Sequence, residues 1–162
     1  MLKLKRKRNP NNVLTEEEVK VARLAEHIGN KISWDDRRRN ELDEEEKTIY
    51  LLYTFYGAYV SLGMAEFLLS TMAPLRGEIE LALERLGTLE TLNALRVCGK
   101  VVLGSSDPGW EEFESLSDDE QWKRRDEASE IGDDFSIVHE LRDGLDALIL
   151  KHFSARGYEL AD

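Results

Sequence analysis

Cysteine and proline are scarce in this chain of 162 residues. It holds one cysteine, which excludes a disulfide within the chain and fits a reducing, cytoplasmic compartment. Cys98 lies in the apolar-periodic stretch 92–98, so we expect a buried thiol that acts as a small hydrophobe. The three prolines and the few runs of β-branched residues favour helix over sheet.

The motifs of common catalytic and metal sites are also missing. His27, His139 and His152 are not joined by a His-x3-His, Glu-x-x-His or Cys-x-x-Cys spacing, so neither a metal nor a cofactor is predicted. Glu66 is the one carboxylate inside a strongly apolar stretch, and we expect it to face solvent or to pair with Arg76. No catalytic residue is predicted, although an enzyme with an unrecognised carboxylate site stays an alternative.

Long hydrophobic runs are absent, apart from the uncharged stretch 48–65. Its 18 residues are at the short limit for a membrane span, and they include two glycines and four tyrosines. Tyr50, Tyr53, Tyr56 and Tyr59 follow one another at steps of three, the spacing of a helical stripe. We therefore predict a helix buried in a bundle, not a membrane span or a base-stacking platform.

Positive and negative charges are divided unevenly along the chain. Residues 1–8 carry five positive charges and no negative ones, and 1–12 are predicted to form a flexible basic tail. The other 154 residues hold 17 Lys/Arg and 33 Asp/Glu, a balance of −16. Such a body repels nucleic acid and anionic membranes and attracts basic surfaces. We predict no direct binding of nucleic acid by the folded body, no membrane association, and a basic protein partner.

Apolar spacing and capping residues predict an all-α fold, in which residues 13–162 form a single acidic domain, an irregular bundle of six to eight helices. Thr15, Asp43 and Asp118 are expected to cap helices. Arg37-Arg38-Arg39 is expected to be neutralised by carboxylates close by. The helices are expected at about 16–28, 44–62, 64–72, 78–86, 89–103, 119–129 and 135–155.

Several stretches resemble a known family. Residues 58–67 stand where that family has Glu-Val-Asn-Asn-Gly-Gly-Phe-x-Gln-Phe, and they share its second glycine and its final phenylalanine. Residues 83–87 are similar to its Leu-x-x-Ile-Gly signature, and Asp134-Phe135 matches the start of its last helix. On these motifs, residues 42–155 resemble the small helical bacterial domains of largely unknown function that are typified by a DNA-mimic protein. The resemblance implies an all-α fold and carboxylates arranged like duplex phosphates, which occupy the DNA site of a regulator.

Carboxylates are densest at 110–134, which holds eleven acidic and three basic residues. We predict a non-enzymatic regulatory protein that presents this acidic face to a basic partner, with DNA mimicry as the sharpest form. An immunity or antitoxin-like protein that neutralises a basic toxin is the alternative, and a plain solvated face explains the same residues. The oligomeric state is left open, a homodimer included. The predicted contacting carboxylates are Asp118, Asp119, Glu120, Asp126, Glu127, Asp133 and Asp134.

Overall fold

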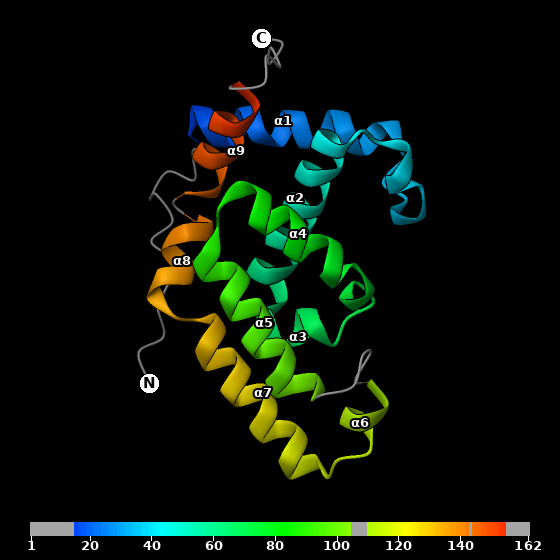
Figure 1. The fold of residues 1–162 in the computed structure, drawn as a ribbon, viewed down its shortest axis with the longest axis vertical. Coiled ribbons are helices and arrows are strands. Elements are labelled where there is room, and N and C mark those ends of the chain that lie inside the picture. The colour runs from blue at the N-terminus through cyan, green and yellow to red at the C-terminus, as the bar shows by residue number, and fades with distance from the viewer. Residues whose placement is uncertain (1–14, 105–109, 143, 155–162) are drawn as a thin grey trace.

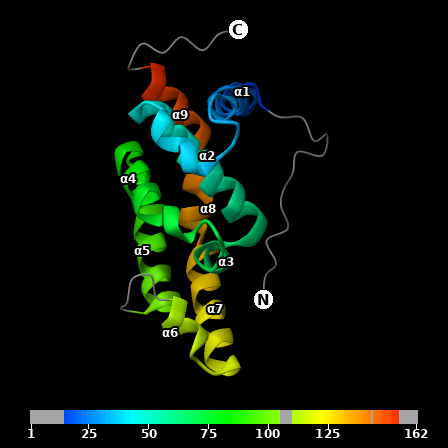
Figure 2. The same cartoon turned by 90° about the vertical axis from the view of Figure 1, so that its right-hand side faces the viewer.

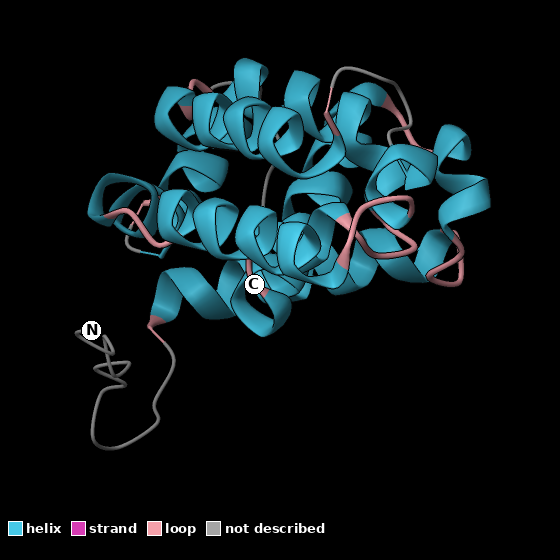
Figure 3. Ribbon diagram, turned by 90° about the horizontal axis from the view of Figure 1, so that it is seen from below, coloured by secondary structure: helices cyan, strands magenta, loops and turns pink. Residues whose placement is uncertain are grey.

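Helices build the part of the chain that the structure describes, residues 15–104, 110–142 and 144–154 of a computed structural model (Figure 1). These ranges contain no strand, as the view from below also shows (Figure 3). They contain seven α-helices of eight residues or more, two of five residues, and two 3-10 turns, so the expected all-α bundle is confirmed. The predicted basic tail at 1–12 lies outside the described residues. The elements are α1 (Glu16–Lys31), η1 (Asp36–Glu41), α2 (Glu44–Leu62), α3 (Met64–Leu68), η2 (Ala73–Leu75), α4 (Arg76–Leu86), α5 (Leu89–Leu103), α6 (Trp110–Glu114), α7 (Asp118–Gly132), α8 (Phe135–Arg142) and α9 (Leu145–Ser154).

The first two long helices begin at the expected caps. The Thr15 hydroxyl accepts from the Glu18 backbone N–H at 3.1 Å, and the Glu18 carboxylate accepts from the Thr15 N–H at 2.6 Å. Asp43 forms the same reciprocal capping box with Glu46 at the start of α2. Gly63 ends α2 with a φ of 86°, a left-handed value that favours glycine.

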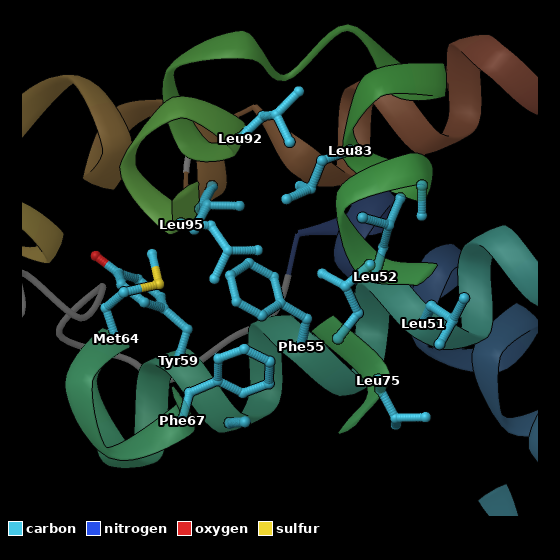
Figure 4. Packing of buried hydrophobic residues seen from close by; sticks show 14 of the residues in the cluster. Leu51, Leu52, Phe55, Tyr59, Met64, Phe67, Leu75, Leu83, Leu92 and Leu95 are labelled. Atoms are coloured by element: carbon cyan, nitrogen blue, oxygen red, sulfur yellow. The ribbon is translucent and has the colours of Figure 1, made fainter. Parts of the chain in front are cut away.

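Helix α2 lies between α1 and α4 and carries much of the core (Figure 2). The rings of Phe55 on α2 and Phe67 on α3 meet edge to face, with centroids 5.0 Å apart (Figure 4). Tyr50 and Tyr59 are buried, and the other two tyrosines of the stripe pack partly buried against the same core, which confirms the core stripe. None of the described helices is both long enough and apolar enough to cross a membrane.

Several expected helix boundaries are wrong, and α1 continues through the expected stop at Gly29 to Lys31. Ser117, not Asp118, caps α7, because the Ser117 hydroxyl accepts from the Glu120 N–H at 3.4 Å and Asp118 takes the first helical position. The helix expected at 64–72 ends at Leu68. The helix expected at 135–155 is divided into α8 and α9 near Gly144, where a Cβ would lie 3.0 Å from the Glu140 carbonyl oxygen. The short helix α6 was not predicted.

The arginine run at 37–39 is neutralised, as expected. Arg37 pairs with Asp35 at 2.8 Å and Arg38 with Glu41 at 2.6 Å, both within the same turn. Arg39 instead pairs with Glu78 of α4, a partner that is distant in the sequence.

Candidate partner-binding surface

Helices α6 and α7 form the end of the molecule opposite to α1 and α9 (Figures 1 and 2). α7 packs along α5 and against α3, and its only buried side-chain positions are Ala128 and Gly132. A Cβ at residue 132 would lie 2.7 Å from the Met64 Cβ, so glycine permits this close approach of α7 to α3. Small residues thus hold the fully buried positions of α7, and Ile131 packs partly buried against the core beside them.

Two buried donors also fix α7 to the core. The Tyr59 hydroxyl donates to the Gly132 carbonyl at 2.7 Å, and the Cys98 thiol donates to the Ala128 carbonyl at 3.4 Å. Cys98 is fully buried, and burial raises the pKa of its thiol to about 11. The expectation of a buried thiol is therefore confirmed, and α7 is positioned from both α2 and α5.

The opposite side of α7 is covered with exposed carboxylates. Six of the seven predicted residues are exposed, while Glu120 is half-buried and lies 3.6 Å from Arg124. Glu130 was not predicted, yet it is exposed on the same side, four residues after Asp126. We call the exposed set of α7 and the turn after it the α7 acidic face: Asp118, Asp119, Asp126, Glu127, Glu130, Asp133 and Asp134.

Two of the three basic residues of α7 point toward carboxylates that lie outside the α7 acidic face. Arg124 lies 3.5 Å from Glu112 of α6, besides its contact with Glu120. Arg125 lies 3.3 Å from Glu66 of α3 and 5.4 Å above the ring of Phe113. Lys123 is exposed and is the one base on the outer side of α7. The acidic charge of the face is therefore little offset by its own helix.

Glu66 faces solvent, as expected, with 49% of its side chain exposed. The alternative, a pair with Arg76, does not form, because Arg76 pairs with Glu80 one turn further along α4, at 2.9 Å. Glu66 pairs with Arg125 instead, a residue of α7 that no local pattern connects to it.

Glu16 at the start of α1 and the three glutamates at the start of α2 have ion-pair partners, in contrast to Asp118 and Asp119 of α7. Glu16 binds Lys20 at 2.7 Å, Glu44 binds Arg85 at 2.7 Å and Glu45 lies 2.9 Å from His152, while Glu46 pairs with Lys31. Six carboxylates of the α7 acidic face have no ion pair with any described residue: Asp118, Asp119, Asp126, Glu127, Glu130 and Asp133. Like charges are thus gathered on one helix without internal compensation.

A small pocket of about 300 Å³ lies where the end of α7 meets the junction of α2 and α3. Its lining is residues 59–64, Ser129 and Asp133. The Tyr59 hydroxyl is already bonded to the Gly132 carbonyl, so the lining offers one carboxylate and no basic side chain for acid–base chemistry. Among the described residues, no group of three or more His, Cys, Asp or Glu side chains is arranged to hold a metal ion.

Comparison with known proteins gives one match. Residues 40–156 match the family model described as DMP19-like protein. This range begins at the end of η1, covers α2 through α9, includes the α7 acidic face, and confirms the resemblance inferred from the sequence. No curated protein and no solved structure matches the chain.

Proposed function

The chain belongs to the DMP19-like protein family, a family of DNA-mimic proteins, and on that premise we propose that its α7 acidic face occupies the DNA site of a basic DNA-binding protein. One observation carries the proposal beyond the family. Six of the seven carboxylates of this face, all but Asp134, form no ion pair with a described residue, whereas Glu16 of α1 and the three glutamates of the first turn of α2 are paired. Charges that the fold does not use are available to a partner.

The spacing of these charges supports the mimicry of a phosphate backbone. Five of these carboxylates lie within α7, from Asp118 to Glu130, over about 18 Å of the axis at ~1.5 Å per residue. That is roughly one carboxylate per 4.5 Å, of the same order as the ~3.4 Å per phosphate along one strand of DNA. A groove lined with Lys and Arg that follows one strand would therefore meet a similar density of negative charge.

Electrostatic pairing of this kind depends strongly on salt. The screening length is ~10 Å at 0.1 M salt and ~3 Å at 1 M, so exposed pairs lose most of their attraction at high salt. In this proposal the protein acts by binding alone: it competes with duplex DNA and transforms no substrate.

A capture experiment at low salt tests the proposal. The immobilised full chain is exposed to native lysate, washed, and eluted first with a defined 20-base-pair duplex and then with rising salt. We expect the partner to leave with the duplex. The triple variant D119N/E127Q/E130Q should lose capture. The matched control E26Q/E84Q/E90Q removes the same number of exposed charges from α1, α4 and α5 and should keep it.

Two results would overturn the proposal. A captured partner that duplex DNA does not displace would favour neutralisation of a basic toxin over mimicry. Equal loss of capture in both triple variants would mean that total charge matters and that the α7 acidic face does not.

A further inference from the structure

Trp122 is an exposed indole of α7 that lies one turn after Asp118 and one turn before Asp126 of the α7 acidic face. Its relative exposure of 69% is the highest among the exposed large hydrophobic side chains. α7 packs on the core through Ala128 and Gly132, on another side of the helix. Trp122 makes no ring contact and no hydrogen bond with any described residue. The fold therefore gives no reason for a large apolar ring at this position.

Carboxylates lie on both sides of this ring along the helix. Asp118 and Asp119 are four and three residues before Trp122, and Asp126 is four residues after it, so all three are its neighbours on the helix surface. Lys123 follows Trp122 and is exposed, while Arg125, three residues after the tryptophan, is directed toward Glu66 and the Phe113 ring. The ring is thus a flat apolar surface bordered by negative charge.

Only one kind of side chain satisfies both parts of this surface. An apolar partner would bury the carboxylates without counter-charges, which is unfavourable, and an anionic partner would be repelled. A lysine ammonium is compact and strongly hydrated, so it pairs with carboxylates but gains little from a flat ring. An arginine guanidinium is planar and weakly hydrated, stacks on an indole, and still directs N–H groups from its edge to carboxylates.

Resting on the function proposed above, we propose that Trp122 is the anchor of the α7 acidic face and receives an arginine side chain of the DNA-binding partner. The guanidinium stacks on the indole while its N–H groups bind Asp119 or Asp126. The proposal deepens the mimicry, because the face then selects arginine over lysine and does not attract every basic protein equally.

Two peptides, each built from a single type of basic residue, test the selectivity for arginine over lysine. Nona-arginine and nona-lysine carry the same charge and are titrated calorimetrically into the full chain at low salt. We expect nona-arginine to bind about 3- to 30-fold more tightly, as an arginine–indole contact allows. In W122A the two peptides should bind alike, at the affinity that the native chain has for nona-lysine. W122F should keep part of the preference. D119N/D126N should weaken both peptides.

The outcomes separate this inference from the proposed function. An arginine-to-lysine affinity ratio that W122A leaves unchanged, or a failure of both peptides to bind, overturns the role of Trp122. If duplex DNA still displaces the captured partner in that case, the mimicry stands without the anchor. If DNA does not displace it, the proposed function fails whatever W122A does. Because Trp122 is exposed, an unchanged melting temperature of W122A excludes unfolding as the cause of a loss.

Discussion

Replacing Asp126 and Glu130 with their amides tests whether the α7 acidic face is maintained at a cost to stability. Glu130 lies in the last turn of α7, which has no basic residue. The carboxyl end of a helix carries a partial negative charge, so a carboxylate there is unfavourable. Asp126 is four residues earlier, and two like charges at this spacing repel each other.

The expected gain in stability can be worked from these two interactions. Removing a carboxylate from the last turn contributes ~0.3–1 kcal/mol, and removing the like-charge pair contributes ~0.2–0.5 kcal/mol. The amides have similar helix propensity to the acids, so D126N/E130Q should be more stable by about 1 kcal/mol. For a domain of this size that corresponds to a melting temperature about 2–4 °C higher.

Thermal unfolding followed by circular dichroism measures the effect at low salt and at 1 M salt. The matched control is D118N/D119N, which removes two charges from the first turn of the same helix, where carboxylates are favourable, and should lower the melting temperature. Both shifts should shrink at 1 M salt. A melting temperature of D126N/E130Q equal to or below that of the native chain at low salt would refute the reasoning. A rise would mean that these charges are kept for a reason outside the fold.

Three further predictions concern the core and its ion pairs. Hydrogen bonds from Arg39 hold the pKa of Glu78 at about 2. The stability that Glu78 contributes is therefore complete above pH ~4.5 and is lost as the pH falls toward 2. The variant E78Q should lower the free energy of unfolding, measured in urea, by ~1–3 kcal/mol at pH 7 and by little near pH 2. G132A places a Cβ 2.7 Å from that of Met64 and should cost ~1–3 kcal/mol, measured by urea unfolding; an unchanged midpoint would contradict the tight contact. Because burial raises the pKa of Cys98 to about 11, its thiol should react with an aromatic disulfide reagent at pH 8 only after unfolding, and rapid reaction of the native protein would contradict its burial.

Features determined by neighbouring residues could be predicted from the sequence. The capping boxes at Thr15 and Asp43 need only a cap and a glutamate three residues later, and both are present in the structure. The start of α7 was displaced by one residue because Ser117 and Asp118 are both good caps, and only the backbone geometry selects between them. The break between α8 and α9 was missed because apolar residues continue at steps of four through it, from Ile137 to Leu145.

The candidate site depends on long-range contacts more than the helix caps and boundaries do. Exposure of most carboxylates on α7 followed from their density, and helical spacing from Asp126 could have identified Glu130 as well. The inward turn of Arg125 could not be predicted, because its partner Glu66 lies on another helix far away in the sequence. Such long-range ion pairs decide which acidic residues have no basic partner. Local sequence patterns contain no information about these pairs.

The small residues on the inner side of α7 have a consequence for how this surface can change over evolutionary time. Ala128, Gly132 and the partly buried Ile131 are the positions of α7 that pack against the core, and they are separate from its exposed carboxylates. Substitutions on the outer side can therefore accumulate without repacking the bundle. A helix organised in this way lets selection retune the choice of partner while the rest of the chain keeps its architecture.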